Sequence, residues 1–427
     1  MRYLLAVLSA GVILTVAAGA PAATYYVSTT GKDTNPGSEK EPWATLQHAA
    51  NTIAPGDTVL VTPGTYAGFH AETSGKAGAV KTLAAQKLGT VLLNAPPAKT
   101  KHNGIIELEN ESGEDAAYWT IEGFEVNGQN GKYRTIDCRH ISHVVIRNNA
   151  VYGSFMTGVY TSWLNYCLIE KNVSHDNKEH GFYQANTSSH NVYRGNVSHS
   201  NAGAGFHLNG DVSQGDKGIV SDTLYERNAS HNTGALINCD GVENSVFRNN
   251  LSYDDRGKGF ALYGGDASIA SRNDRVLNNT VVCAAEAFFA VVIKRNQNTN
   301  VDPVGNKLFN NILYNKNAAA NRGSIVIDAG GFKDFESDYN VVMEHFGVDD
   351  AETILTFAQW QAKGYDKHSI QAKLADLFAD PDSGDYHLKA GSPAIDAGTA
   401  LPDVTDDKDG VTRPQGKGYD IGRYEHR

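Results

Sequence analysis

Two aspartates in neighbouring segments of the chain, Asp211 and Asp240, are the sharpest chemical feature of the sequence. Each follows a short strand-like run, and strands stacked in a sheet lie about 5 Å apart. Two carboxylates at that spacing repel each other unless a cation, a shared proton or a base offsets their charge. We therefore expect the pair to hold Ca²⁺ or to act on a sugar ring. The alternative is that both are turn residues, because Asn-Gly-Asp and Cys-Asp-Gly are ordinary turn sequences.

Several side chains near these aspartates could supply a base. His207 is neutral near pH 7 and could remove a proton next to a carboxylate, and His180 lies just before the corresponding run of the preceding repeat. A hydrogen-bonded surface histidine is the alternative, since the chain has 15 histidines. Alternation along extended runs puts Tyr160, Tyr183, His207, Asn209, Asp211, Asn238, Asp240 and Tyr263 on one exposed face. The catalytic candidates are His207, Tyr183, Lys258, Asp240 and His180; the substrate-binding candidates are Tyr160, Asn209, Asn238, Tyr263 and Arg256; the metal-binding candidates are Asp211 and Asp240, with Asn209 and Asn238 as further oxygen ligands.

The elements that position these side chains are repeats, each a short apolar run that ends in asparagine. The recurring asparagines are 22 to 32 residues apart. The shorter intervals suit one coil of a β-solenoid, and the longer ones suit a coil with a loop insertion. Asparagine tolerates tight-turn dihedral angles and can hydrogen-bond the backbone of the next coil, so we expect a ladder. Its members are Asn149, Asn172, Asn196, Asn228, Asn250, Asn279 and Asn311.

Positions counted from the ladder asparagines form further columns. Three residues after them, His175, His199 and His231 could bind a metal, but Tyr152 and Tyr253 continue the same column and favour a stack of rings. Two residues before them, Arg and Glu alternate, so that stacked coils bring opposite charges together. This charged column is Arg147, Glu170, Arg194, Glu226 and Arg248. Three residues before the asparagines, an apolar inner row is expected from Ile146, Ile169, Tyr193, Tyr225 and Phe247.

The composition limits the class of protein. The 427 residues carry a formal net charge of -11. This disfavours binding to nucleic acid, because such binding depends on clusters of Lys and Arg. The 43 glycines, 20 tyrosines and 15 phenylalanines indicate a turn-rich β protein. No two of the four cysteines have CxxC spacing, so we expect buried free thiols, or one disulfide, rather than a zinc ribbon.

The first residues predict export. Arg2 precedes an apolar run over residues 3–18 and then small residues that permit cleavage after Ala22 or Ala23. Neither this run nor any later segment is long enough for a comfortable membrane span. We therefore expect a secreted or periplasmic monomer with no membrane span in the mature chain.

The repeats resemble the right-handed parallel β-helix of the pectin-lyase-like superfamily over most of the mature chain. Residues 25–66 are similar to the segment that begins many secreted members, and a short amphipathic helix over 45–53 would cover the open end. Residues 384–399 and 413–425 are similar to the closing segment, and a helix over 351–363 would help to cover the other end. The resemblance implies an all-β, single-stranded right-handed parallel β-helix with short capping helices at both ends. The expected divisions are a signal peptide (1–23), an N-terminal strand and capping helix (24–70), the β-helix (71–345) and a C-terminal closing segment (346–427).

One segment, residues 257–265, is similar to the motif of the pectate lyases of polysaccharide lyase family nine, in which a lysine base follows a phenylalanine. Here Phe260 is followed by Ala261. The calcium-binding aspartate cluster of that family is not reproduced in the preceding coil. Lys258 could replace the base from a neighbouring position along the strand, so the mechanism of that family is not transferred residue by residue.

Export, a β-helix and a polar face together predict a secreted carbohydrate-active enzyme that binds an extended polysaccharide along the side of the helix. The favoured reaction is lyase cleavage, a β-elimination on a uronate-containing polysaccharide. His207 would be the base, Asp211 and Asp240 would hold Ca²⁺ or the sugar, and Tyr183 and Tyr263 would stack or donate protons. No organic cofactor is expected. Two alternatives remain open: a glycoside hydrolase that uses Asp211 and Asp240, and a non-catalytic cell-surface or carbohydrate-binding protein.

Overall fold

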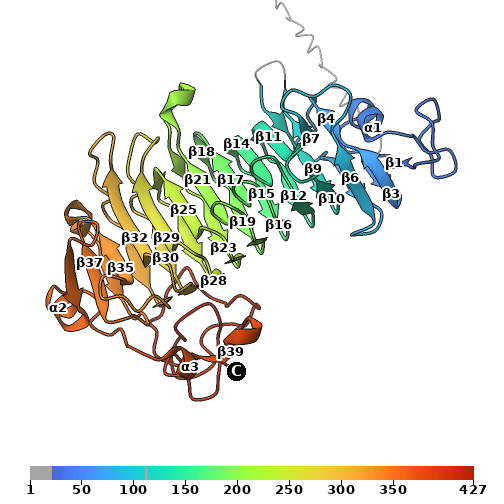
Figure 1. Ribbon diagram of the computed structural model, residues 1–427. Helices are drawn as coiled ribbons and strands as arrows, with labels where there is room; N and C mark the ends of the chain where they lie inside the picture. Colours follow the sequence, from blue (N-terminus) through green and yellow to red (C-terminus); the bar gives the residue numbers. More distant parts are fainter. Residues whose placement is uncertain (1–21, 111–113) are drawn as a thin grey trace, which may run out of the picture.

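The computed structural model describes residues 22–110 and 114–427, so the predicted signal peptide lies outside the described residues except for its last two. The chain winds into a stack of coils whose strands form three long, almost entirely parallel sheets (Figure 1). We call them sheets A, B and C. Three parallel sheets wound about one axis define a parallel β-helix, and this confirms the predicted all-β fold.

Sheets A and B contribute one strand each to most coils. Sheet A contains β1 (Thr24–Val27), β2 (Thr58–Val61), β5 (Lys81–Ala85), β9 (Trp119–Glu122), β12 (Val145–Arg147), β15 (Leu168–Glu170), β19 (Val192–Arg194), β23 (Leu224–Glu226), β27 (Val246–Arg248), β30 (Arg275–Leu277), β33 (Lys307–Phe309) and β36 (Glu336–Asp338). Sheet B contains β3 (Gly64–Ala67), β6 (Val91–Ala95), β10 (Glu125–Asn127), β13 (Ala150–Tyr152), β16 (Val173–His175), β20 (Val197–His199), β24 (Ala229–His231), β28 (Leu251–Tyr253), β31 (Thr280–Cys283) and β34 (Ile312–Asn315).

Sheet C carries the longest strands and the predicted site residues. It contains β4 (Phe69–Ala71), β7 (Gly104–Leu108), β8 (Ala116–Ala117), β11 (Arg134–Ser142), β14 (Val159–Asn165), β17 (Phe182–Ala185), β18 (Ser188–Ser189), β21 (Phe206–Asn209), β22 (Val220–Ser221), β25 (Ala235–Asp240), β26 (Val242–Glu243), β29 (Lys258–Gly264), β32 (Phe289–Asn296), β35 (Gly323–Ile327), β37 (His345–Val348) and β38 (Thr353–Thr356). β39 (Phe378–Asp380) and β40 (Asp385–Leu388) form a separate antiparallel pair. The short helices are α1 (Leu46–Thr52), α2 (Phe357–Ala362), α3 (Leu374–Leu377), η1 (Val212–Gln214), η2 (Ala329–Phe332) and η3 (Pro381–Ser383).

The asparagine ladder forms as predicted and extends one coil further, to Asn340. At each step the backbone and side-chain nitrogens of one asparagine donate to the Oδ1 of the next; for Asn196 the distances to Asn228 Oδ1 are 2.9 and 3.1 Å. Asn228 Nδ2 also donates to the carbonyl oxygen of Tyr193 at 2.9 Å. All members are buried. The ladder therefore satisfies buried backbone groups at the corner between sheets A and B.

The predicted columns stack in the predicted register. The inner row is fully buried, and its Tyr193 and Tyr225 rings stack at 4.5 Å. In the charged column, Glu226 accepts from Arg194 and Arg248 at 2.5 and 2.7 Å. Burial alone would raise the pKa of Glu226, but the two arginines keep it below its ordinary value. The histidine column is a continuous stack of rings with centroid spacings of 4.6 to 5.1 Å, which runs through Tyr152, His175, His199, His231 and Tyr253.

The two ends of the solenoid differ from the prediction in detail. Helix α1 is capped by Thr45 and buries Leu46, Ala49 and Ala50, as expected. The strands β1 to β4 already pair with strands of later coils, so the solenoid begins before residue 71. The helix predicted over 351–363 is wrong in its first half. Residues 353–356 pair antiparallel with β37, and α2 starts only after Thr356, which forms a capping box with Gln359.

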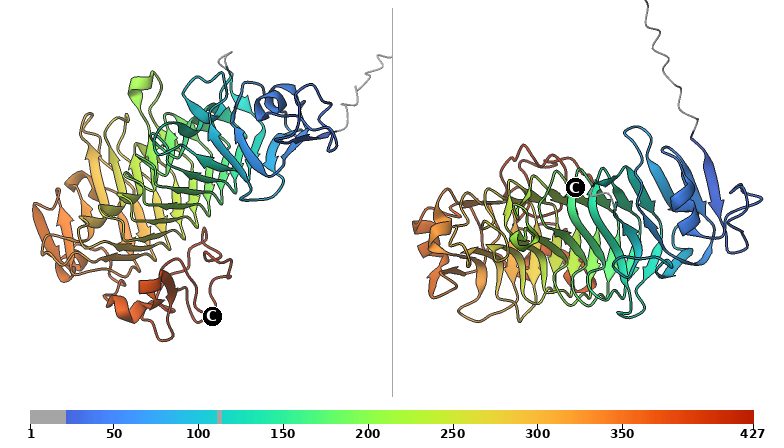
Figure 2. Two further views of the ribbon diagram at one scale, coloured as in Figure 1. Left: turned by 45° about the vertical axis from the view of Figure 1, so that its right-hand side comes forward. Right: turned by 90° about the horizontal axis from the view of Figure 1, so that it is seen from above.

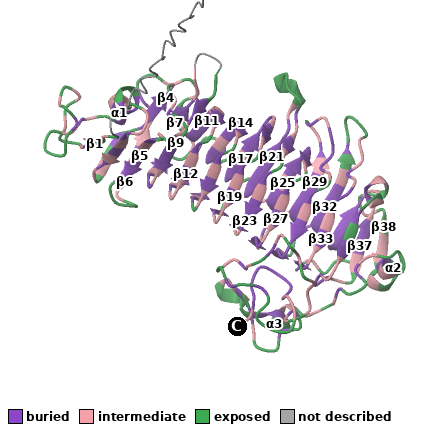
Figure 3. Cartoon of the chain, turned by 180° about the vertical axis from the view of Figure 1, so that it is seen from behind, coloured by how far each residue is buried: buried purple, intermediate pink, exposed green. Residues whose placement is uncertain are grey.

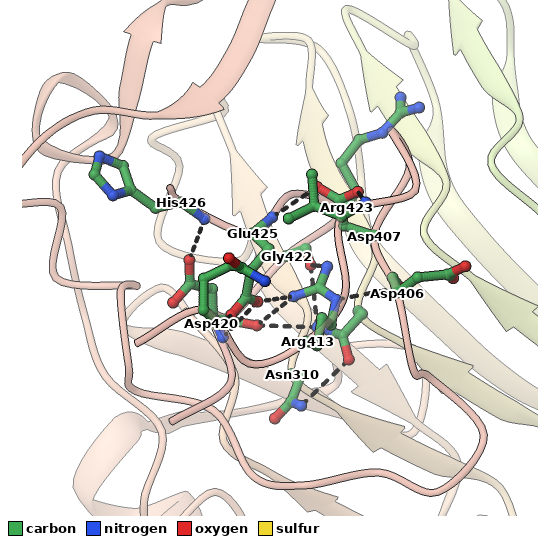
Figure 4. A network of polar contacts seen from close by, with 12 residues as sticks. Asn310, Asp406, Asp407, Arg413, Asp420, Gly422, Arg423, Glu425 and His426 are labelled. Atoms are coloured by element: carbon green, nitrogen blue, oxygen red, sulfur yellow. Dashed lines mark hydrogen bonds and ion pairs between the residues drawn. The ribbon is translucent and has the colours of Figure 1, made fainter. Parts of the chain in front are cut away.

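The C-terminal segment folds back against the side of the coils (Figure 2). Asn278 Nδ2 donates to the carbonyl oxygens of Asp420 and Gly422, which ties the segment to the corner between sheets A and B. Within the segment, Arg413 and Glu425 form a fully buried ion pair at 2.8 Å (Figure 4). Arg413 also donates to the carbonyl oxygens of Asp420 and Gly422 at 3.1 and 2.9 Å. Hydrogen bonds and a buried ion pair, as well as apolar contacts, therefore hold the C-terminal segment in its folded conformation.

The interior of the solenoid is mainly apolar, with a few hydrogen-bonded polar side chains such as Gln184. Figure 3 shows buried residues running along the strands of every coil, with exposed residues gathered in the connecting loops. The four cysteines are free and buried, in agreement with the preferred prediction. No helix with the length and hydrophobicity of a membrane span occurs in the part of the chain that the structure describes.

We predict that Asn228→Ala lowers the free energy of unfolding by on the order of 3 kcal/mol, because it leaves Asn196 donors and the Tyr193 carbonyl unpaired in the interior. Urea denaturation followed by circular dichroism measures the loss. Asn51→Ala on the exposed side of α1 is the control and should change the midpoint little. Equal midpoints for both variants would mean that the ladder does not stabilise the coil stack.

Candidate functional site

The outer face of sheet C carries two columns of side chains, many of which are buried by their neighbours. Register pairs along the first column are Tyr160 with Tyr183, Tyr183 with His207, His207 with Asn238, and Asn238 with Ala261. Along the second column they are Ser162 with Ala185, Ala185 with Asn209, Asn209 with Asp240, and Asp240 with Tyr263. The strand alternation predicted from the inward-facing phenylalanines is therefore confirmed, since Phe182, Phe206 and Phe260 are buried.

His207 lies in a cluster of rings. Its ring centroid is 4.5 Å from that of His180 and 4.5 Å from that of Tyr183. Its Nδ1 is 2.9 Å from Nδ2 of Asn238, and only 7% of the residue is exposed. Burial, and then the neighbouring His180, hold the pKa of His207 well below its ordinary value. His207 is therefore neutral, but it is enclosed by its neighbours and already hydrogen-bonded.

His180 is also occupied. Its Nδ1 accepts the backbone N–H of Ala204 at 2.8 Å, and its ring packs edge-on against Tyr183 at 5.5 Å. Burial lowers the pKa of His180, opposed by the nearby charge of Glu179. The structure thus brings His180, His207 and Tyr183 together as predicted, as a packed and uncharged cluster.

Two asparagines orient two tyrosines on this face. Asn209 Nδ2 donates to the hydroxyl of Tyr183, and Asn238 Nδ2 donates to the hydroxyl of Tyr263, both at 2.9 Å. Burial raises the pKa of both tyrosines, so each phenol keeps its proton at neutral pH. Because the tyrosine oxygens accept from the asparagines, their own O–H groups are free to donate to a ligand.

The prediction that Asp211 and Asp240 lie side by side is wrong. The register pairs Asp240 with Asn209, which places Asp211 two residues beyond β21. Asp211 instead caps η1, where its carboxylate accepts from the N–H of Ser213 at 2.8 Å. The turn interpretation therefore holds for Asp211. The physical reason is that Phe206 packs opposite Ile237, and this apolar pairing fixes the register.

Asp240 is buried and holds a turn. Its two carboxylate oxygens accept the backbone N–H groups of Gly265 and Asp266 at 2.7 and 3.0 Å. Burial raises the pKa of Asp240, although these N–H donors act in the opposite direction. The residues present do not fit the predicted calcium site, because Asp211 is displaced and both oxygens of Asp240 are used. Among the described residues, no group of three or more His, Cys, Asp or Glu side chains is arranged to hold a metal ion.

A cavity of about 360 Å³ opens beside the ring cluster, where the first column changes to short side chains. Ala261 and Val292 form its floor, since they follow Asn238 in the column. Its walls are Lys258, Tyr263, Phe288 and Lys294, with a rim from Gly257, Gly264, Gly265 and Gln297. The small side chain of Ala261 thus creates the space that the larger residues of earlier coils fill.

Lys258 is the distinctive group of this cavity. Its Nζ lies 5.9 Å from the centre of the Tyr263 ring. Among the described residues, no acidic side chain lies within 4 Å of that nitrogen, in contrast to Lys294, which pairs with Asp350. Burial lowers the pKa of Lys258, and the positive charge of Lys294 lowers it further. Partial burial without an acidic partner is the kind of environment that makes lysine a base.

The remaining candidates lie at the margins. Tyr160 packs edge-on against Tyr183 at 5.4 Å and extends the polar face toward the N-terminal coils. Arg256 is exposed and donates to the carbonyl oxygens of Asn232 and Asn201, away from the cavity walls. Sequence reasoning missed Phe288 and Val292, which come from the next coil. Phe260 pairs with Val291, so Val292 lies beside Ala261, but no local motif in the sequence marks either Phe288 or Val292.

The comparisons agree with this fold. A model of the family described as Pel9A-like, right-handed beta helix region, matches residues 25–321. The chain is thus a right-handed parallel β-helix of the pectin-lyase-like type. It belongs to the Pel9A-like right-handed β-helix family. A comparison with curated proteins finds no significant match.

Solved structures resemble the chain at low sequence identity. Pectate lyase Pel9A has a TM-score of 0.61 and 17% identity, with 96% of this chain and 97% of that chain covered. A rhamnogalacturonan lyase has a TM-score of 0.57 and 16% identity, covering 86% and 95%. An alginate lyase from Paenibacillus sp. str. FPU-7 has a TM-score of 0.52 and 18% identity, covering 69% and 95%. At these identities the likeness shows the fold alone.

We predict that the pKa of Lys258 lies below the ordinary value of a lysine, and that Lys294→Met raises the pKa of Lys258 because a like charge is removed. Nuclear magnetic resonance of ¹³C-dimethylated lysines measures both values. Lys307→Met, which removes an exposed lysine paired with Glu336, is the control and should not move the Lys258 signal. A pKa of Lys258 at the ordinary lysine value would contradict this description of the cavity.

Proposed function

We propose that the protein is a polysaccharide lyase that cleaves a uronate-containing polysaccharide by β-elimination at the cavity above Ala261. The observation that carries the proposal is Lys258, a half-buried lysine without an acidic partner beside a second lysine. The lyase names of three structural neighbours are consistent with it. The export sequence predicted over 1–23 leads us to propose further that the protein acts as a monomer outside the cytoplasm.

Lys258 is the proposed base. Its lowered pKa increases the fraction of neutral amine near neutral pH, and only the neutral amine can accept a proton. The amine removes the hydrogen on C5, next to the uronate carboxylate, and the electron pair forms the C4–C5 double bond. Negative charge develops on the carboxylate during this step. Lys294, which also lines the cavity, would stabilise that charge.

Tyr263 is the proposed acid. The bond from C4 to the glycosidic oxygen breaks as the double bond forms, and the leaving oxygen needs a proton. Tyr263 keeps its proton because burial raises its pKa, and Asn238 orients its oxygen. The phenol donates to the leaving oxygen, and the proton on Lys258 returns through solvent. The products are a sugar with an unsaturated end and a shortened chain, with no water added across the bond.

This assignment differs from the sequence-based prediction of the base. His207 is neutral, but its Nδ1 is engaged by Asn238 and it does not line the cavity. We assign His207 a positioning role, because its ring packs against Tyr183. Asn238 in turn contacts both His207 and Tyr263. The polar side chains of Tyr160, Tyr183 and Asn209 continue the face and would bind neighbouring sugar units.

A retaining glycoside hydrolase is less well supported. That reaction needs two carboxyl groups about 5 Å apart with access to the sugar. The register separates Asp211 from Asp240, and backbone N–H groups occupy the oxygens of Asp240. The remaining alternative, a binding protein without catalysis, predicts no unsaturated product.

We predict that Lys258→Met lowers the elimination rate by about 10²- to 10⁴-fold, the usual contribution of a general base. The substrates are pectate, alginate and rhamnogalacturonan, and the readout is the ultraviolet absorbance of the unsaturated product. For the native protein the rate should rise with pH as Lys258 loses its proton. Lys217→Met, on an exposed loop, is the matched control. No product from any of the three substrates with the native protein would contradict the proposal.

We predict that Tyr263→Phe lowers the rate by on the order of 10²-fold without shifting the ascending limb of the pH profile, because that limb belongs to Lys258. The same absorbance assay measures the effect. Tyr339→Phe, in a ring stack with His368 far along sheet A, is the control. An unchanged rate for Tyr263→Phe would exclude it as the proton donor.

A further inference from the structure

Six rings gather at one corner of the solenoid, where the strands of sheet C lead into those of sheet A. We call this group the aromatic corner. It comprises Tyr118, His140, His143, Trp163, Tyr166 and His190. Trp163 lies in β14 and Tyr166 directly follows this strand, which also contains Tyr160 of the candidate site. The corner is therefore continuous with the polar face of sheet C.

The rings form two parallel stacks. Tyr118, His143, Tyr166 and His190 follow one another in successive coils with centroid distances of 4.6, 5.3 and 4.8 Å. The Trp163 ring stacks on His140 at 4.2 Å with an interplanar angle of 6°. Tyr166 is 57% exposed, and His143 and His190 are exposed as well. The aromatic corner is thus an exposed row of stacked rings that runs parallel to the axis of the β-helix.

These rings stand in a backbone conformation that does not favour them. All four members of the longer stack have φ between 55° and 59°, and Trp163 has φ of 48°. Left-handed backbone disfavours bulky residues and is common for Asn, Asp and Gly. Later coils place Asp222, Asn244 and Asn273 at the same turn, also with positive φ.

The position of Trp163 is also occupied by an asparagine in another coil. Asn186 follows Ala185, the register partner of Ser162, so it occupies the place of Trp163 in the next coil, with φ of 62°. The fold therefore accepts asparagine at these positions without rings. Strained side chains that the fold does not require are characteristic of ligand-binding positions.

We propose that the aromatic corner is a second carbohydrate-binding surface, which holds a stretch of the polysaccharide chain beside the reaction site. Exposed aromatic rings bind the apolar faces of sugars, and an exposed patch of this kind on a soluble protein indicates an interaction site. Ser142, Asn165 and Ser189 directly precede His143, Tyr166 and His190 in the chain. Their side chains are neutral hydrogen-bonding groups of the kind that bind sugar hydroxyls. The choice of a polysaccharide as occupant rests on the proposed function, since the corner shares β14 with the proposed site.

The test uses substitutions that the chain itself supplies. Trp163→Asn and Tyr166→Asn, combined, place at each position the residue found in another coil, so the backbone is not strained. Affinity electrophoresis in gels that contain pectate, alginate or rhamnogalacturonan measures binding without turnover, on a Lys258→Met background. We expect retardation by at least one polysaccharide, and binding weaker by about threefold to tenfold for each ring removed.

The control is His199→Asn, which removes one ring from the stack on sheet B. It should retain full retardation. Retardation of the double variant equal to that of the control, or no retardation of the parent protein in any of the three gels, would overturn the proposal and leave the rings as a structural stack. Thermal unfolding of each variant confirms that it is folded. Failure of the lyase assay together with normal retardation would reject the proposed function and retain the binding surface.

Discussion

The asparagine ladder is the interaction on which the rest of the molecule depends. Each step joins two coils through paired hydrogen bonds to one buried Oδ1, so a coil cannot slip by a residue without losing both bonds. Once the coils are in register, side chains at equal positions stack into columns. The inner aromatic row, the Arg and Glu column, the histidine stack and the polar face of sheet C all follow from that one alignment. Function on this fold is therefore a question of which residues share a column.

The sequence was sufficient for most of the architecture because the ladder asparagines and the residues counted from them are close in the chain. Residues near the ladder, such as Ile146 and His199, were placed correctly. The side chains of the candidate site lie about ten residues after the ladder, where turn lengths vary. Ile237 follows Asn228 by nine residues, whereas Phe206 follows Asn196 by ten and a loop insertion follows Asn209. Alignment by residue type therefore paired Asp211 with Asp240, and burial of Phe206 against Ile237 decided otherwise.

The chemistry of the site depends on the small side chain of Ala261 and on two lysines beside it. Ala261 leaves a space in a column that rings and an amide fill in the earlier coils, and Lys258, which has no acidic partner, and Lys294, which pairs with Asp350, line that space. The positive charge of Lys294 near this apolar floor lowers the pKa of Lys258, and it would also attract the carboxylate of a bound sugar. No motif in the sequence announces this arrangement, because Phe288, Val292 and Lys294 belong to a different coil.

The central claim is that a uronate sugar binds above Ala261 with its C5 hydrogen directed at Lys258. A crystal structure of Lys258→Met with a bound oligouronate tests it most directly. The account predicts the sugar carboxylate beside Lys294, C5 facing residue 258, and the glycosidic oxygen within about 3 Å of the Tyr263 hydroxyl. An oligosaccharide bound in the cavity with C5 turned away from residue 258, or bound to another sheet, would contradict it.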